Sequence, residues 1–415
     1  MPNRSKSFYT LSSYAIMALI LTVQQKWQIQ MLMLTILLVT YHNSIRERTY
    51  LLRAAVAHPS LSPWQYLYDH GDDCSFLHLT GLTREAFIVL QSILFPPAPP
   101  DEFGRRPPGR PKLLDNSSSV GLLLFYLGST MTYKHLCMIF GIVPTQCSTY
   151  IRDMLLLATD KLCDHPLSSV RFPDAEKMQQ FAAMINAREP LIDDVIGFMD
   201  GVSLPTECTS DQYEQNAMYD GYSCDTTVNN VLAYGPDGKV FLSALNFPGS
   251  WTDGKLSAHF IDFIKRKIGR YKICVDQGFP RQGDAYGILV GPISRRSARG
   301  LHRHVRDYLL KISNIHTSLR QASEWGMRGL QGTFPRLKRR LPSDNTKRRL
   351  VLEAIVFVHN LRTGIVGKNQ IKTVFDPEYE RIHAVEGYDR IRQYYFVPGE
   401  YDTDDDEDES GSDNE

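Results

Sequence analysis

The sequence has few of the features that mark zinc-binding, disulfide-linked or secreted chains. Its seven cysteines, at positions 74, 137, 147, 163, 208, 224 and 274, form no C-x-x-C pair and no cluster with histidine. An odd, scattered set of cysteines is typical of reduced thiols in the cytosol or nucleus. The spacing therefore excludes a zinc site of the Cys/His kind and a disulfide framework.

Hydrophobic runs long enough to cross a membrane are also missing. Two apolar runs, at 14–23 and 31–41, are separated by Gln-Gln-Lys-Trp-Gln at 24–28. Each run falls short of the roughly 18 to 20 residues that a bilayer requires. We expect residues 1–60 to form an apolar helical segment that is buried or faces a partner. A signal sequence or membrane anchor stays open as an alternative, because Arg4 and Lys6 precede the first run.

The net charge is zero, but the charged residues are distributed unevenly along the chain. The chain has 46 basic and 46 acidic residues, and ten of the acidic ones lie between Glu400 and Glu415, where there is no Lys or Arg. Without that tail, 46 basic residues face 36 acidic ones, a net charge of +10. A basic body favours a polyanionic partner. The tail at 400–415 is too polar to bury a core, so we expect it to be disordered.

Length and composition indicate a globular protein of two or three folding units. The chain has 415 residues, of which 43% are hydrophobic and 22% charged. A linker rich in Pro and Arg at 96–112 should be extended, since proline at this density blocks helices and central strands. Its Gly-Arg-Pro at 109–111 suits an A·T-rich minor groove, and a plain basic linker is the alternative.

Residues 61–165 have the pattern of an all-α region. The apolar spacing at 79–95 predicts an amphipathic helix with Thr83 as its N-cap. A second helix follows Thr132, Gly141 makes a turn, and Pro144 lies in the first turn of a third helix. Two helices joined by a short turn with glycine are typical of a helix-turn-helix, although a plain helical bundle has the same spacing.

In the helix-turn-helix interpretation, the helix that begins near Pro144 carries the DNA-contacting face. Ile142, Cys147 and Ile151 should point inward. The polar face available to bases and phosphates is then Thr145, Gln146, Ser148, Thr149 and Arg152.

From about residue 190 to 365 the pattern changes to alternating strands and helices. Apolar runs bounded by turn residues predict strands at 195–199, 228–234, 240–245, 271–275 and 288–290. Helices are expected at 258–268, with Ser257 as its cap, and at 301–329. This order predicts an α/β fold with a mixed five-stranded sheet and flanking helices.

Three carboxylates occupy positions where they can act together. Asp200 and Asp276 follow buried apolar runs, and Glu324 lies inside the long helix. Strand-end carboxylates of an α/β sheet converge where ligands bind, and hard oxygen ligands suit Mg²⁺ or Mn²⁺. Two such ions can promote an in-line phosphodiester displacement. The plainer alternatives are Asp-Gly turns and a helical salt-bridge ladder of Glu324 with Arg320 and Arg328.

Four segments together resemble the PIF/Harbinger-type DDE transposases. They are Phe-Met-Asp-Gly at 198–201, Asn-Phe-Pro-Gly-Ser-Trp-Thr-Asp at 246–253, Val-Asp-Gln-Gly-Phe-Pro at 275–280, and Ser-Glu-Trp-Gly at 323–326 with Phe-Pro-Arg-Leu at 334–337. The resemblance implies an RNase H-like fold for the catalytic domain at 190–365, preceded by the helix-turn-helix region. Residues 366–399 form a C-terminal extension of it.

The resemblance also implies the site and its partners. Asp200, Asp276 and Glu324 would be the catalytic triad that binds two Mg²⁺ or Mn²⁺ ions, with Asp253 as an accessory residue. The family often has His before this Asp, where this chain has Thr252. A separate Myb-like DNA-binding companion is implied as well, and assembly into a homo-oligomer stays open.

A basic stretch supports DNA as the partner. Between Arg295 and Arg349 there are fifteen basic residues and three acidic ones. Such a density favours contact with phosphates, though a solvated basic helix is the alternative. Lys-Arg-Arg at 338–340 and again at 347–349 also suits nuclear import. The residues expected to follow the DNA backbone are Arg295, Arg296, Arg299, Arg303 and Arg306.

The sequence therefore predicts a nuclear, metal-dependent DNA endonuclease and strand transferase. The main alternative is a domesticated, transposase-derived DNA-binding protein without cleavage activity. A third interpretation, a membrane-anchored protein of unrelated activity, rests only on the N-terminal apolar runs.

Overall fold

The structure is a computed structural model that describes residues 5–48, 51–96, 112–293, 302–367 and 369–376. Several predicted features lie outside these residues: the proline-rich linker apart from its ends, Arg295, Arg296 and Arg299, and nearly all of the C-terminal extension with the acidic tail.

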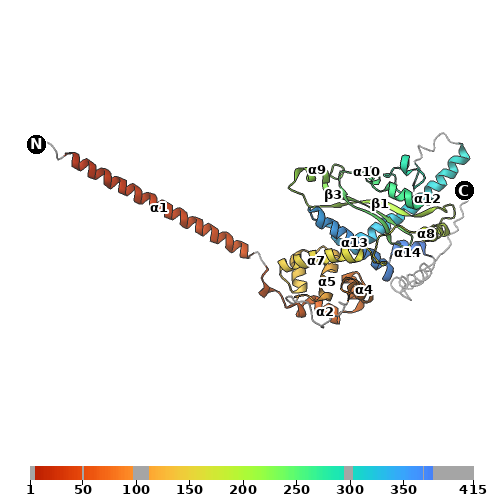
Figure 1. The fold of residues 1–415 in the computed structure, drawn as a ribbon, viewed down its shortest axis with the longest axis horizontal. Helices are drawn as coiled ribbons and strands as arrows, with labels where there is room; N and C mark the ends of the chain where they lie inside the picture. The colour runs from red at the N-terminus through yellow and green to blue at the C-terminus, as the bar shows by residue number, and fades with distance from the viewer. Residues whose placement is uncertain (1–4, 49–50, 97–111, 294–301, 368, 377–415) are drawn as a thin grey trace, which may run out of the picture.

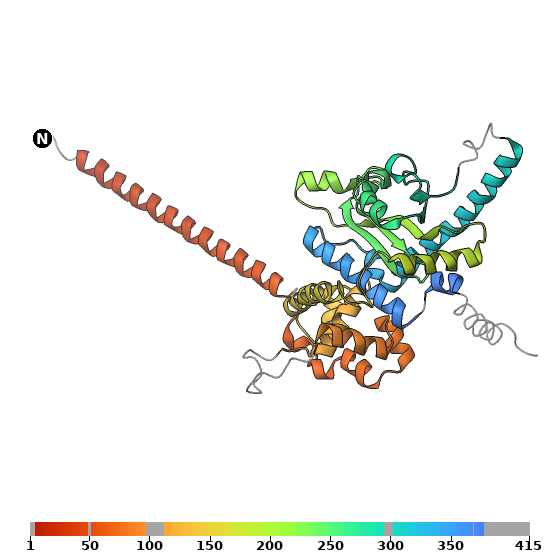
Figure 2. The same cartoon turned by 45° about the vertical axis from the view of Figure 1, so that its right-hand side comes forward.

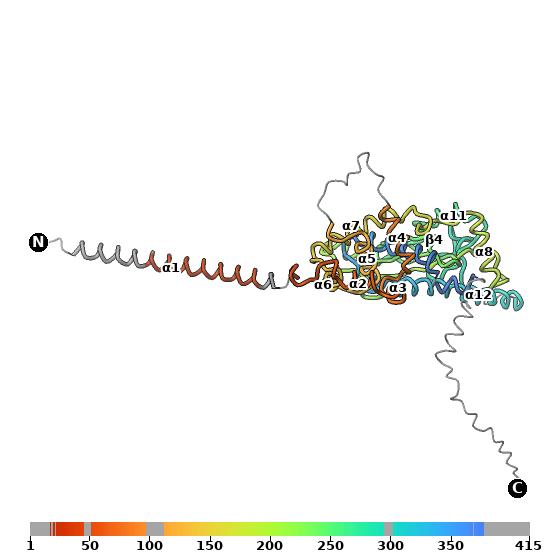
Figure 3. Tube along the Cα trace, turned by 90° about the horizontal axis from the view of Figure 1, so that it is seen from below, coloured from red at the N-terminus to blue at the C-terminus, as the bar shows by residue number. Residues whose placement is uncertain are grey.

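The N-terminal segment is one helix, α1 (Ser5–Arg48), which projects away from the body of the protein (Figures 1 and 3). The polar residues at 24–28 do not interrupt it, because Gln and Lys are good helix formers. Side chains from residue 22 to 43 are exposed, so the expectation that the chain buries this helix is wrong. Its role as a partner-facing helix stays a prediction. Among the described residues no helix is long and apolar enough to cross a membrane.

A layer of helices follows, at the bottom of the body in Figure 2. Its helices are α2 (Pro63–His70), α3 (Asp73–Thr80), α4 (Arg84–Leu94), α5 (Asn116–Leu127), α6 (Tyr133–Phe140) and α7 (Pro144–Leu162), after the 3-10 turns η1 (Arg53–Ala55) and η2 (Pro59–Leu61).

Glycines in the left-handed conformation end two of these helices. Gly81, at φ 76°, ends α3, so the helix predicted from residue 79 begins only at Arg84. Thr83 caps α4 as predicted, because its hydroxyl accepts the Ala86 N–H at 3.3 Å. Gly141, at φ 66°, ends α6, and Pro144 is the first residue of α7.

Within the part of the chain that the structure describes, the sheet has six strands, one more than predicted. The additional strand has only two residues, too few to leave a periodic signal in the sequence. The strands are β1 (Val195–Pro205), β2 (Tyr219–Asp220), β3 (Asp225–Tyr234), β4 (Val240–Pro248), β5 (Lys272–Val275) and β6 (Leu289–Val290). Their order is β2-β3-β1-β5-β6, with β4 paired to β3. The pairs made by β3 are antiparallel, whereas β1–β5 and β5–β6 are parallel. Such a mixed α/β architecture is compatible with a DDE nuclease fold.

The remaining helices cover the sheet or its loops. They are α8 (Ala175–Arg188), α9 (Gln212–Met218), α10 (Asp253–Ser257), α11 (Ile261–Ile268), α12 (Arg303–Thr333), α13 (Asn345–Ile365) and α14 (Gln370–Phe375), with the 3-10 turns η3 (Gly283–Ala285) and η4 (Pro335–Lys338). Ser257 is therefore the last residue of α10 and not the cap of the next helix, since its hydroxyl bonds back to the Gly254 carbonyl.

Alternating side chains divide the sheet between two hydrophobic layers. Phe198 and Cys274 point to the layer that contains α12 and α13. Met199 and Val275, their neighbours in sequence, point to the layer that contains α8 and α11. The core under α12 and α13 continues without a break into the helices α2–α7. The predicted region at 61–165 thus shares its core with the sheet.

The stability of that shared core should depend on Gly121 in the buried helix α5. A Cβ atom at this position would lie 2.3 Å from the ring of Trp64, which is 1% exposed. Gly121→Ala should lower the free energy of unfolding by about 1–3 kcal/mol through overpacking. Gly329→Ala is the matched control: this exposed helical glycine has open space around it, so alanine should stabilise by about 0.5–1 kcal/mol. Urea unfolding measures both, and equal effects would contradict the packing argument.

Candidate active site

Asp200 and Asp276 are brought together by the register of two parallel strands. Met199 of β1 pairs with Val275 of β5, so the next residue of each strand is an aspartate. Asp276 directly follows β5, as predicted. Asp200 does not end β1, which continues to Pro205 because it stays paired with β3 after β5 has ended. The strand end that the sequence predicts at residue 199 is therefore the point where the pairing of β1 with β5 stops.

Asp200 shares a face of the sheet with α12. It lies two residues after Phe198 in β1, so its side chain has the orientation of a residue that packs toward α12. Gly326 lets α12 approach the sheet, since a Cβ there would lie 2.8 Å from the Tyr234 ring. The Ser323 hydroxyl lies 3.4 Å from Asp200 Oδ2.

Glu324 is the neighbour of Ser323 on α12, but an arginine holds its carboxylate. Arg320, one turn earlier, forms an ion pair with Glu324 Oε1 at 2.8 Å. The structure therefore contains the helical salt bridge that the sequence offers as an alternative. Glu324 nevertheless lies on α12, the helix that contacts Asp200 through Ser323.

Asp253 reaches the two aspartates from α10 through a gap left by two glycines. A Cβ on Gly201 would lie 2.6 Å from Asp253 Oδ1, and one on Gly278 would lie 2.8 Å from Asp253 Oδ2. Gly201 and Gly278 also donate their N–H groups to Asp200 and Asp276, at 2.9 and 2.8 Å. Gly201 and Gly278 thus both lie against the Asp253 carboxylate, and Gly278 also lies against the carboxylate of Asp276.

The electrostatics of these carboxylates reflect burial and mutual repulsion. Burial raises the pKa of Asp200 to about 6, and the negative charge of Asp276 adds to the rise. The Gly201 N–H and the Arg320 guanidinium oppose it by favouring the charged form. Burial and Asp276 also raise the pKa of Asp253. A positive charge placed here would be stabilised.

Hard carboxylate oxygens are the ligands that Mg²⁺ and Mn²⁺ prefer. The site offers such oxygens on Asp200, Asp276, Asp253 and, after a side-chain rearrangement, Glu324. Among the described residues, however, no three His, Cys, Asp or Glu side chains are gathered into a metal-holding group. The carboxylate oxygens suit a divalent cation. For Glu324 to bind that cation, its carboxylate must first release Arg320.

The predicted DNA-contacting residues of α7 lie on its outer face. Gln146 is half-buried, and its side chain accepts the Val143 N–H at 3.3 Å. Ile142, Cys147 and Ile151 are buried as expected. The exposed residues are Thr145, Ser148, Thr149 and Arg152, the last of which pairs with Asp153 at 2.9 Å.

The basic residues of the C-terminal half are used in different ways. Arg303 and Arg306 share one acidic neighbour, Asp307, at 3.9 and 3.6 Å. Arg348, by contrast, is only 1% exposed, and its guanidinium donates to the carbonyls of residues 342 and 343. Arg340 is tied to Asp225 at 2.9 Å. Part of the basic composition thus stabilises the fold.

Comparison with known proteins identifies the region that holds these carboxylates. Residues 199–360 match the family model of the DDE superfamily endonucleases. This match supports the DDE transposase superfamily and, in general terms, a transposase or nuclease function for this part of the chain. No curated protein and no solved structure matches the chain.

The sequence did not reveal what surrounds the acids. Gly201 and Gly278 read as turn residues, although each leaves room for Asp253. Ser323 gave no signal beyond its place next to Glu324. The sequence contains Asp-Gly at 200–201 and Asp-Gln-Gly at 276–278. Only the fold shows that Asp253 lies next to both segments.

The raised pKa of Asp200 predicts a pH dependence of stability in metal-free protein. Between about pH 4 and 6 the folded chain keeps a proton that the unfolded chain, with its ordinary pKa of 3.8, has lost. The free energy of unfolding should therefore fall as pH rises through this range, by up to about 3 kcal/mol. Asp200→Asn should reduce this fall, leaving the contribution of Asp253, and should be the more stable protein at pH 7.

Urea unfolding at a series of pH values, with a chelator present, measures the effect. Asp262→Asn, which changes an exposed carboxylate of α11, should keep the wild-type pH dependence. Parallel curves for the wild type and Asp200→Asn would contradict the assigned pKa.

Proposed function

We propose that the chain is a metal-dependent DNA endonuclease and strand transferase of the PIF/Harbinger type, with an RNase H-like catalytic domain. The observation that carries the proposal is the parallel register of β1 and β5, which sets Asp200 and Asp276 side by side where that pairing ends. The match to DDE superfamily endonucleases over 199–360 agrees with this assignment.

In this proposal Asp200, Asp276 and Glu324 hold two Mg²⁺ or Mn²⁺ ions, and Asp253 is an accessory residue. The ions would make the attacking water or 3′-hydroxyl more acidic and stabilise the leaving oxygen. The chain supplies the rest: parallel strands fix two carboxylates, Gly201 and Gly278 orient them through N–H bonds, and α12 brings Glu324. Arg320 supplies positive charge to the site until the ions bind.

DNA is the proposed substrate and partner. α6 and α7 would act as the helix-turn-helix, with Thr145, Gln146, Ser148, Thr149 and Arg152 toward the DNA. Arg303 and Arg306 would contact phosphates together with Arg295, Arg296 and Arg299, which lie outside the described residues. A nuclear location, a Myb-like companion and a homo-oligomer belong to the same proposal.

A second candidate is a domesticated DNA-binding protein that no longer cuts. Two observations favour it: Glu324 is engaged by Arg320, and the described residues contain no assembled metal-holding group. The two candidates differ in cleavage and agree in DNA binding.

Cleavage of supercoiled DNA with Mg²⁺ or Mn²⁺ separates them. The wild type should nick the DNA, and Asp276→Asn should reduce the rate by at least about 100-fold while leaving DNA binding intact, because one ligand of the ions is lost. Asp200→Asn and Glu324→Gln should behave alike. Asp262→Asn is the matched control and should cleave normally.

Cleavage that survives Asp276→Asn would sink the proposed site. A wild type that binds DNA without cutting it would support the domesticated binder.

Phosphate contact by α12 predicts a change in salt dependence. Replacing both Arg303 and Arg306 by Ala should reduce the slope of log K against log salt concentration by about 2, for any DNA sequence. The matched control replaces Lys265 and Arg266, two exposed basic residues of α11. Fluorescence anisotropy measures the binding, and equal slopes in both double variants would show a nonspecific charge effect instead.

A further inference from the structure

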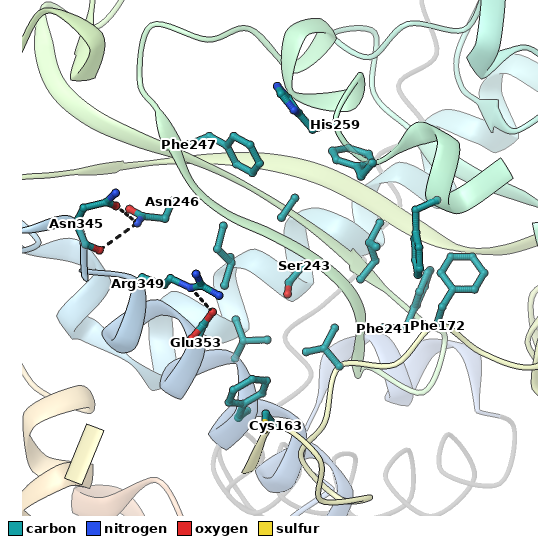
Figure 4. A pocket seen from close by; sticks show the side chains of 18 of the residues that line it. Cys163, Phe172, Phe241, Ser243, Asn246, Phe247, His259, Asn345, Arg349 and Glu353 are labelled. Carbon is teal, nitrogen blue, oxygen red and sulfur yellow. Dashed lines mark hydrogen bonds and ion pairs between the residues drawn. The ribbon is translucent and has the colours of Figure 1, made fainter. Parts of the chain in front are cut away.

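A cavity of about 860 Å³ lies away from the carboxylates, along the outer side of β4. Residues 241–247 of this strand, seven in a row, form its floor. Figure 4 shows Phe241, Ser243, Asn246 and Phe247 arranged along the groove. Nothing in the proposed cleavage reaction uses this groove.

The groove exposes the edge of the sheet. Among the described strands β4 pairs only with β3, so its other edge has no strand partner. An unpaired edge presents a row of N–H and C=O groups that suits an added strand. An extended peptide is therefore the ligand that the floor of the groove would take.

Both walls of the groove are helical. Arg349, Glu353 and Phe357 of α13 lie on one side, and Phe263 of α11 with the preceding Phe260 lies on the other. The free edge of β4 therefore lies between α13 and α11.

The groove has an apolar end and a polar end. Phe172 packs edge-on against Phe241 and Phe263, at 5.5 and 5.9 Å between ring centroids, and closes the apolar end. The Arg349–Glu353 ion pair, at 2.7 Å, lies toward the polar end with Asn345 (Figure 4). Each wall contributes an aromatic side chain, Phe357 from α13 and Phe263 from α11, and the α13 wall also carries the charged pair.

We propose that the groove binds residues 391–398 of the same chain as an additional strand next to β4. This segment reads Ile-Arg-Gln-Tyr-Tyr-Phe-Val-Pro and ends just before the acidic tail. Tyr394, Phe396 and their neighbours Tyr395 and Val397 are strong β formers. In an extended strand they place large apolar groups on both faces, which can meet Phe357 on one wall and Phe263 on the other.

The chain has the reach for this contact. Asn369 donates to the Gly238 carbonyl at 3.1 Å, two residues before β4 begins, and the described chain ends at Asp376. Fifteen further residues lead to Ile391, and an extended connection of that length spans about 50 Å. The nine residues of β4 extend over only about 30 Å. The contact is independent of whether the carboxylates cut DNA.

Hydrogen exchange on the full-length chain tests the contact from both sides. In the wild type, amides of 241–247 that do not pair with β3 and amides of 391–397 should be protected together. Phe396→Lys should speed exchange in 241–247 at least tenfold, and Phe263→Glu, on the groove wall, should do the same in 391–397. The matched controls are Tyr379→Asp, outside the segment, and Tyr286→Glu, an exposed aromatic away from the groove.

Unchanged exchange in β1 shows that each variant is folded. Fast exchange of 391–397 in the wild type, or protection of 241–247 that survives Phe396→Lys, would overturn the proposal. Protection that appears only with dimerisation, measured by light scattering, would assign the groove to the segment of a second copy and overturn the contact within one chain.

Discussion

The parallel pairing of β1 with β5 is the constraint on which the candidate site depends. It fixes Met199 opposite Val275, and the two next residues are Asp200 and Asp276. Because β1 continues along β3 after β5 has ended, the first aspartate is held in a strand while the second starts a loop. One carboxylate is thereby rigid, and the other depends on the Gly278 N–H for its orientation.

Bringing carboxylates together has an electrostatic cost that the metal-free chain relieves in two ways. Below about pH 6 Asp200 keeps its proton, because its pKa is raised to about 6, and Arg320 lends positive charge. Arg320 also pairs with Glu324. The same arginine therefore supplies positive charge to both Asp200 and Glu324.

Local patterns in the sequence predicted much of the fold and only part of the site. The apolar runs before Asp200 and Asp276 gave two strands, and Thr83, Gly141 and Pro144 gave helix boundaries that the structure confirms. The two-residue strand β2 left no periodic signal, and the extension of β1 to Pro205 depends on its partner β3. Asp253 was recognisable only as an accessory residue, because the two glycines that admit it are distant in sequence.

The continuous core has a consequence for how DNA contact and cleavage relate. α7, with the predicted DNA-contacting face, packs against α13, and α13 packs against the sheet that holds Asp200. A helix that shares a close-packed core with the sheet cannot shift without disturbing it. The outer face of α7 is therefore held in fixed geometry relative to the sheet. If α7 binds DNA and the carboxylates cut it, as proposed, the core, and not a flexible linker, would determine which phosphate reaches the carboxylates.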